Sequence, residues 1–335
     1  MGAVLAPERI LKELSDLWVS LAKPVDGDAS GREQGVLRAC SMTLVVLAEQ
    51  AEDSSALGET LAALMPEHPA RTMVVRLRGG SERVLEDRVY AQCWMPFGQR
   101  RQICCEQIEI TASDSALGDL PSVVLPLAVA DLPLIVWCRS PRLIGMPEFR
   151  AIASMAHKVT IDSAEIADGR AVLPRLAAAL QRDVLLGDLA WTRLTRWREM
   201  LSQMFENREY LDLLPNVTAV QVSFGARLET SAWYMAGWLV NSLAQAGVHP
   251  AVSVEGTPGS TDPLRVALKG PSIDAELHRQ EDRLVVSVNG LSHCTSLSEP
   301  TDYLLMREEL GIVRRDPVFE SALTTAARLA GARMP

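Results

Sequence analysis

The chain carries too few basic residues to form a surface for a nucleic-acid backbone. Lysine and arginine together number 33, aspartate and glutamate number 42, and the formal net charge is −9 at pH 7. Proteins that bind phosphate backbones or anionic lipid surfaces use the opposite balance, because they must neutralise negative charge. We therefore expect neither nucleic acid nor a membrane as a partner.

The motifs that hold common cofactors are also absent. No GxGxxG follows a predicted strand, so the dinucleotide fingerprint is missing, and there is no GxxxxGK[ST] phosphate loop or GxSxG nucleophile motif. The five histidines match no metal-binding spacing: His68, His157, His249, His278 and His293. The sequence thus predicts a protein with no catalytic residues, no metal site and no cofactor of its own.

The cysteines contain no CxxC pair. They are scattered along the chain: Cys40, Cys93, Cys104, Cys105, Cys138 and Cys294. The first residues favour an amphipathic helix over an export signal, because Ile10, Leu14 and Leu17 repeat at helical spacing after Pro7. Scattered cysteines in a chain of this size without an export signal are typical of reduced thiols. We expect a cytoplasmic protein with free thiols.

The apolar runs predict an α/β domain followed by an α+β domain. In the first half, runs suited to strands buried on both faces of a parallel sheet alternate with helical segments. These runs are Met42–Ala48, Thr72–Leu77, Leu132–Cys138 and Lys158–Asp162. We expect a doubly wound, mostly parallel sheet here. The predicted organisation is an N-terminal helix and loop at 1–35, the α/β domain at 36–170 and the α+β domain at 171–335.

An antiparallel hairpin interrupts this pattern. Arg88–Met95 alternates between apolar and polar residues, and a turn at 96–99 joins it to RRQICCEQIEI at 100–110. Adjacent residues on a strand point to opposite faces, so Cys104 and Cys105 should lie in different environments.

The alternation breaks within the second strand of this hairpin. Ile103 and Cys105 share one phase, whereas Ile108 and Ile110 share the other, which predicts a β-bulge between Cys105 and Ile108. The two thiols at 104 and 105 are either small core hydrophobes or groups with a chemical role. The sequence leaves both interpretations open.

The second half of the chain does not alternate regularly. Asp188 is a plausible helix N-cap, and the helix that follows places Trp197 and Leu201 on one apolar stripe. A strand, a Trp-rich helix, two or three further strands and two terminal helices complete the chain. This order predicts the α+β class.

Five sequence blocks together resemble one known family. In chain order they are RRQICCEQIEI at 100–110, LPSVVLPLAVADLPLIVW at 120–137, HKVTIDSA at 157–164, GDLAWTRLTRWRE at 187–199 and WYMAGWL at 233–239. The chain resembles the OpcA family, described as glucose-6-phosphate dehydrogenase assembly proteins. It departs from the family pattern in a turn at 96–99 that has less glycine, and in Arg196, where a proline is usual.

This resemblance implies a non-catalytic assembly factor and allosteric activator of glucose-6-phosphate dehydrogenase in the oxidative pentose phosphate pathway. NADP and glucose 6-phosphate would then belong to the partner enzyme. The family's link to thiol redox control makes Cys104 and Cys105 candidate redox residues and a thioredoxin a candidate second partner. The candidate partner-binding residues are Arg100, Arg101, Glu106, Gln107, Trp197, Arg198 and Glu199.

Each of these assignments has an alternative. The candidate contact residues could instead stabilise the fold, for example as ion pairs and as part of a tryptophan core. A thiol switch requires at least one exposed cysteine with a lowered pKa. The chain could also be an enzyme or binding protein for a sugar phosphate or nucleotide, with its site at the carboxyl ends of the strands in the α/β domain.

Overall fold

The computed structural model describes residues 5–21, 36–95, 102–180, 185–257 and 263–332. Contacts divide the chain into two compact units, Met1–Ile161 and Asp162–Pro335. The boundary that the sequence placed after residue 170 falls in the first turn of α6 (Gly169–Ala179), a helix that packs on α12 (Pro317–Gly331) within the second unit.

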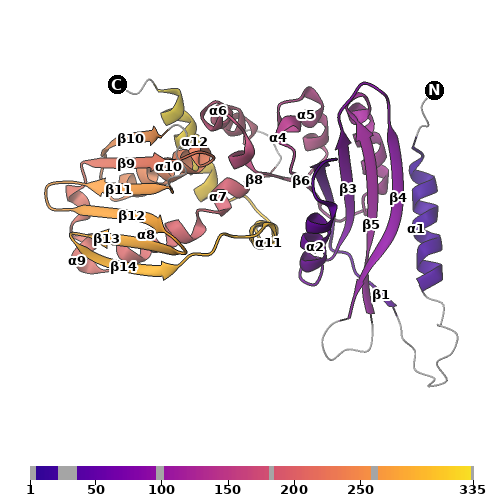
Figure 1. Cartoon of the computed structure of the whole chain (residues 1–335), viewed down its shortest axis with the longest axis horizontal. Coiled ribbons are helices and arrows are strands. Elements are labelled where there is room, and N and C mark those ends of the chain that lie inside the picture. Colours follow the sequence, from indigo (N-terminus) through magenta and orange to yellow (C-terminus); the bar gives the residue numbers. More distant parts are fainter. Residues whose placement is uncertain (1–4, 22–35, 96–101, 181–184, 258–262, 333–335) are drawn as a thin grey trace, which may run out of the picture. The chain divides into compact units, whose positions relative to one another are not determined.

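The first unit is built on a mostly parallel sheet, as the apolar runs predicted. Its strands follow the spatial order β1-β5-β3-β2-β6-β7, and β4 pairs antiparallel with β5 (Figure 1). The strands are β1 (Val36–Arg38), β2 (Met42–Glu49), β3 (Ala70–Arg78), β4 (Leu85–Trp94), β5 (Gln102–Ser113), β6 (Leu134–Cys138) and β7 (Lys158–Ile161). Strands β2, β3 and β6 are almost wholly buried, because helices cover both faces of a doubly wound sheet.

The helices of this unit connect its parallel strands, except for the first helix, which precedes β1 in the chain. They are α1 (Pro7–Leu21), α2 (Ser54–Leu64), the 3-10 turn η1 (Asp114–Asp119), α3 (Leu120–Leu127), α4 (Pro141–Ile144) and α5 (Pro147–Ser154), followed by the 3-10 turn η2 (Ser163–Glu165) in the second unit. Helix α1 packs on β4 and α3, and its apolar stripe explains why Ile10 and Leu14 are buried.

Strand β5 does not contain the predicted bulge. It pairs with β4 in one unbroken register, from Ile103 opposite Trp94 to Ala112 opposite Leu85, and with β3 in another. The apparent change of phase in the sequence has a different cause. Glu106 lies on the same buried face as Ile108 and Ile110, so a charged residue occupies a position where alternation calls for an apolar one.

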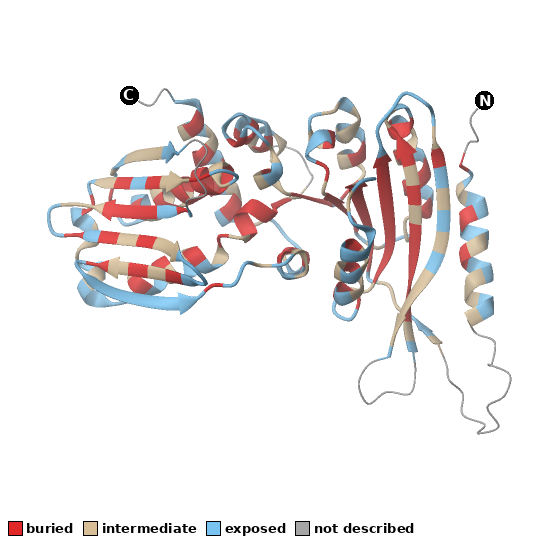
Figure 2. Ribbon diagram, viewed as in Figure 1, coloured by how far each residue is buried: buried red, intermediate tan, exposed pale blue. Residues whose placement is uncertain are grey.

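The second unit is α+β, in agreement with the prediction from its irregular order of elements. Its mixed sheet has the order β10-β9-β11-β12-β13-β14, in which only β9 and β10 pair in parallel. The strands are β9 (Ala219–Phe224), β10 (Ala251–Gly256), β11 (Arg265–Lys269), β12 (Asp274–Gln280), β13 (Arg283–Val288) and β14 (Leu291–Ser296). Every residue of β14 at the sheet edge is exposed (Figure 2).

Helices α6, α10 and α12 pack together beside this sheet, and α10 contacts both β9 and β10. The remaining elements of this unit are β8 (Leu185–Asp188), α7 (Leu189–Thr192), α8 (Thr195–Met204), α9 (Arg208–Leu211), the 3-10 turn η3 (Leu214–Asn216), α10 (Glu229–Gln245) and α11 (Asp302–Gly311). Three aromatic rings, of Trp191, Tyr234 and Phe319, lie with centroids 5.7–6.1 Å apart in its core. Among the described helices of the chain, none has the length and apolarity to span a membrane.

Candidate functional site

The β4–β5 hairpin brings two cysteines together that are 11 residues apart in sequence. Cys93 and Cys104 lie directly opposite each other in the antiparallel register, with 4.0 Å between their Cα atoms, and form a disulfide. The prediction that all six cysteines are reduced thiols is therefore wrong for this pair. The sequence did not reveal this pair, because the turn expected at 96–99 would place Cys93 opposite Gln102, whereas the observed register places it opposite Cys104.

Cys105 lies in a different environment from Cys104, as the alternation predicted. It is 1% exposed, and its Sγ donates a hydrogen bond to the Ala39 carbonyl at 3.3 Å. Burial raises the pKa of the Cys105 thiol to about 11. Buried thiols with a raised pKa are unreactive, so the lowered pKa that a redox role requires is absent at Cys105.

Glu106 forms the centre of a buried ion-pair cluster. Its carboxylate accepts hydrogen bonds from Trp18 Nε1 at 2.5 Å and from Arg71 Nε at 2.6 Å, and it lies 2.8 Å from a guanidinium nitrogen of Arg38. Arg71 also donates to the Leu127 carbonyl at 2.6 Å. The cluster ties α1, β3, β5 and α3 together, which favours a structural role for Glu106 over contact with a partner.

The rest of the hairpin divides into a buried and an exposed part. Gln107 is only 7% exposed, so little of it can touch another protein, whereas Arg100 and Arg101 lie outside the described residues. On the face of β5 opposite Glu106, an apolar row has Leu37, Ile103 and Trp94 side by side on β1, β5 and β4. Leu37 is 42% exposed, and its two neighbours are partly exposed.

The candidate residues on α8 also separate by burial. Trp197 is 7% exposed and packs in the core. The guanidinium of Arg198 stacks over the Trp191 ring at 3.6 Å from its centroid and donates to the Trp191 carbonyl at 2.8 Å. Burial lowers the pKa of Arg198 to about 10, which leaves it charged at neutral pH. Of this group only Glu199 points to solvent, where it pairs with Arg196 at 2.9 Å.

Asp188 confirms its expected role as a helix cap and has further contacts that the sequence did not reveal. Its Oδ1 accepts from the backbone N–H of Ala190 and of Ser163, both at 3.0 Å, and its Oδ2 accepts from the Tyr234 hydroxyl at 2.7 Å. The carboxyl group is fully buried, and burial raises its pKa to about 6. This network joins the start of α7 to α10 and serves the fold of the second unit.

The carboxyl end of β2 is unsuited to a dinucleotide, although ligands of doubly wound sheets usually bind at this edge. Residues 49–53, which lead from β2 into α2, contain no glycine and three carboxylates. Glu49 pairs with Arg142 at 3.3 Å, and Glu52 pairs with Arg139. Carboxylates at this position repel a pyrophosphate, and their guanidinium partners are already engaged. The hypothesis of a phosphorylated ligand at this edge of the α/β domain thus lacks support.

Two family models match the chain, one after the other in sequence. The N-terminal domain model of the glucose-6-phosphate dehydrogenase subunit matches residues 61–178, and the C-terminal domain model of the same subunit matches residues 185–323. The chain belongs to the OpcA family. The resemblance inferred from five sequence blocks is thereby confirmed.

Curated relatives of this family member come from cyanobacteria. A Synechocystis protein named OpcA, whose name assigns it to the OxPP cycle, is 22% identical over 229 residues, which are 65% of this chain and 47% of that protein. A protein of the same name from Nostoc punctiforme is 24% identical over 179 residues, which are 52% of this chain and 38% of the relative. The chain thus matches about half or less of the length of these relatives.

The fold of this family member is similar to that of a solved oxidoreductase. A 3-ketoreductase from Actinomadura kijaniata, crystallised with TDP-benzene and NADP, has a TM-score of 0.50 at 14% identity over 86% of this chain and 95% of the enzyme chain. At this identity the similarity concerns the fold alone.

Proposed function

We propose that this protein is a non-catalytic partner of glucose-6-phosphate dehydrogenase that promotes assembly of the enzyme and raises its activity. The observation that carries this proposal is the match of both units to the two domains of the glucose-6-phosphate dehydrogenase subunit family. The acidic, glycine-free end of β2 supports a role without a bound nucleotide.

Activation would follow from differential binding. A protein that binds the active form of an enzyme more tightly than the inactive form shifts the equilibrium towards the active form. A tenfold gain in apparent substrate affinity corresponds to about 1.4 kcal/mol of coupling free energy. One interface of modest size supplies that difference, so no chemistry is required of this chain.

The end of the hairpin at Trp94 and Ile103 is the contact surface that we favour. Its apolar row of Leu37, Ile103 and Trp94 is partly exposed, and Arg100 and Arg101, which lie outside the described residues, come shortly before Ile103 in the sequence. Apolar contacts surrounded by arginine are typical of protein–protein interfaces. Burial leaves Glu106, Gln107 and Trp197 to stabilise the fold, and Glu199 remains a second, exposed candidate.

The test is a titration of the dehydrogenase of the same organism with this protein, at substrate below its Michaelis constant. We expect a saturating rise in activity and a complex that co-elutes in gel filtration. Leu37→Ser and the double replacement of Arg100 and Arg101 by alanine should weaken the complex at an almost unchanged melting temperature. Leu291→Ser on β14 is the matched control, since Leu291 is also an exposed leucine on a strand, at 64% exposure, and lies outside the hairpin.

Absence of both complex and activation, under reducing and oxidising conditions alike, would refute the proposal. Equal activation by the wild type and the hairpin variants would move the contact surface away from the hairpin. A thioredoxin as second partner is tested in the same assay, by adding reduced thioredoxin and measuring whether the activation changes. We expect any such effect to depend on Cys93 and Cys104, because burial keeps Cys105 unreactive.

A further inference from the structure

The second unit contains a cavity of about 510 Å³ that none of the residues discussed above explains. Its volume lies in the usual range for small-molecule sites. It opens where the parallel strands β9 and β10 end, at Phe224 and Gly256, which are paired in register. Helix α10 connects these two strands and begins at the cavity. In open sheets this edge, at the carboxyl ends of parallel strands, is where ligands bind.

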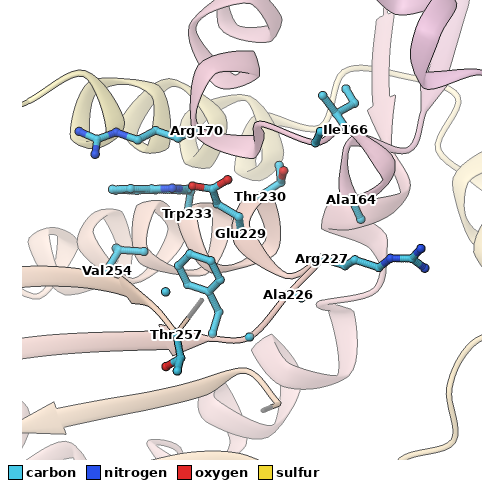
Figure 3. A pocket seen from close by; sticks show the side chains of 14 residues that line it. Ala164, Ile166, Arg170, Ala226, Arg227, Glu229, Thr230, Trp233, Val254 and Thr257 are labelled. Atoms are coloured by element: carbon cyan, nitrogen blue, oxygen red, sulfur yellow. The ribbon is translucent and has the colours of Figure 1, made fainter. Parts of the chain in front are cut away.

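Residues from several elements line the cavity (Figure 3). Helix α10 contributes Glu229, Thr230 and Trp233, and Arg170 comes from α6, whereas Val254 and Thr257 lie on the side of β10. Position 256 is occupied by glycine because the Cβ of any other residue would lie 2.8 Å from the Phe224 ring. The ring of Phe224 can therefore lie against this strand and form part of the wall.

The start of α10 lacks the usual cap. Its N-cap residue is Leu228, whose side chain makes no capping hydrogen bond, and the bond from the N–H of Ala232 to the Leu228 carbonyl opens the helix. The backbone N–H groups of Glu229, Thr230 and Ser231 therefore come before the first donor of the helical hydrogen-bond ladder and have no carbonyl one turn earlier in the helix. Such N–H groups, together with the positive end of the helix dipole, attract anions.

A second, independent observation indicates a ligand. The indole Nε1 of Trp233 is buried and has no hydrogen-bond partner among the described residues, and the side chain as a whole is 2% exposed. Trp233 lines the cavity. A buried N–H without an acceptor is costly, and native proteins rarely leave one unsatisfied. An acceptor oxygen of a ligand in this cavity would satisfy it.

The charges around the cavity favour an anion. Arg170 donates to the carbonyls of Ala330 and Ala332 at the end of α12, and Glu229 accepts from the N–H of Gly169 at 3.0 Å. Arg227 is exposed and has no side-chain partner within the described part of the chain. Its φ of 67° holds it in the left-handed region, which is unfavourable for a residue with a side chain and frequent at binding sites.

We propose that this cavity binds a small phosphate monoester, with the phosphate at the start of α10 beside Arg227 and another ligand oxygen accepting from Trp233 Nε1. Three phosphate oxygens match the several N–H donors of the helix start and a guanidinium. The aromatic and aliphatic wall of Phe224, Trp233 and Val254 holds the organic part of the ligand. A sugar phosphate and a nucleoside monophosphate share this chemistry, and the experiment distinguishes them.

The experiment is isothermal titration of the full chain, without any partner, with glucose 6-phosphate, AMP, inorganic phosphate and glucose. At least one ester should bind at least tenfold more tightly than glucose and than inorganic phosphate, and the tighter ester identifies the organic part. Failure of both esters to bind at millimolar concentration overturns the proposal. Equal binding of glucose or of inorganic phosphate overturns it too. Because no dehydrogenase is present, this result is independent of the proposed partner function.

Four variants locate the binding in the cavity. Arg227→Gly removes the guanidinium at a backbone position that suits glycine and should weaken binding tenfold or more, whereas Arg227→Lys should retain most of it. Glu229→Gln removes a like charge, keeps an acceptor for the N–H of Gly169 and should tighten binding several-fold. Trp233→Phe removes the N–H donor together with the five-membered ring of the indole and should weaken binding.

The matched control is Arg208→Ala, which removes an exposed arginine at the start of α9, outside the cavity. It alters the net charge by the same amount as Arg227→Gly, and it should leave the affinity unchanged because Arg208 does not line the cavity. Unchanged affinity in both Arg227→Gly and Glu229→Gln, with melting temperatures near that of the wild type, would show binding elsewhere and overturn the assignment. Those two variants carry the test if Trp233→Phe proves unstable.

Discussion

Replacing Glu106 by alanine tests whether its buried carboxylate is essential to the stability of the first unit. The Glu106 side chain is 3% exposed and that of Arg71 is 8% exposed, with 2.6 Å between their paired atoms. Truncation would leave the Arg71 guanidinium in the core without its carboxylate, and would also remove the acceptor of the Trp18 N–H. Breaking a buried pair by removing one partner costs about 3–5 kcal/mol. A typical domain is stable by only about 5–15 kcal/mol.

Urea unfolding of the full chain, combined with hydrogen exchange of the amides in β3 and β5, measures this loss. Hydrogen exchange is needed because the chain has two units and its unfolding need not be two-state. Glu13→Ala is the matched control, since Glu13 is 42% exposed and forms an ion pair with Arg9 one turn earlier on α1. An exposed pair of this kind contributes well below about 1 kcal/mol.

The double variant Arg71→Met with Glu106→Leu decides whether the effect comes from an unpaired charge. Replacing both partners of a buried ion pair by apolar residues is often close to neutral. We therefore expect the double variant to be clearly more stable than Glu106→Ala. A loss below about 1 kcal/mol in Glu106→Ala, or a double variant as unstable as the single one, would refute the reasoning.

Three further predictions follow from buried groups. Burial raises the pKa of Asp188 from 3.8 to about 6. The stability that the protonated carboxyl group contributes is therefore complete below pH 3.8 and is lost as the pH rises through 6, on the order of 3 kcal/mol in all. Asp188→Asn should remove this part of the pH dependence, and an identical pH profile of the melting temperature in variant and wild type would contradict the prediction. Cys105 should react with a thiol reagent in the native protein far more slowly than the exposed Cys294, and comparable rates, followed by mass spectrometry, would disprove its burial. Gly187→Ala should lower the free energy of unfolding by about 1–3 kcal/mol, because the added Cβ would lie 1.9 Å from a carboxylate oxygen of the buried Glu309. The control is Gly58→Ala on α2, where the added Cβ would meet open space and should raise the free energy of unfolding by up to about 1 kcal/mol.

Local sequence was sufficient for the features that depend on neighbouring residues. The alternation of Arg88–Met95 predicted the antiparallel pairing of β4 with β5, although not its register. Short polar residues predicted helix starts, as at Asp188, whose side chain accepts from the N–H of Ala190. The order of apolar runs predicted the parallel sheet of the first unit and the α+β class of the second.

Expectations failed where a residue's surroundings come from distant parts of the chain. The predicted bulge after Cys105 was wrong because Glu106 is buried, and it is buried because Arg71 on the neighbouring strand neutralises it. The same cluster buries the candidate contact residue Glu106, which favours a structural role for it. Trp197 likewise is enclosed in the core and is not available at the surface.

The sequence by itself determined the family, the order of the elements and the absence of dinucleotide and phosphate-loop motifs, because each of these features depends on residues that are close together in the chain. Only the tertiary structure decided which charges are neutralised, which cysteines pair and where a cavity forms. The cavity in the second unit joins Arg170, Arg227 and Thr257, residues that no local periodicity connects. Burial and electrostatics depend on distances in space, and these are fixed only when the strands and helices pack.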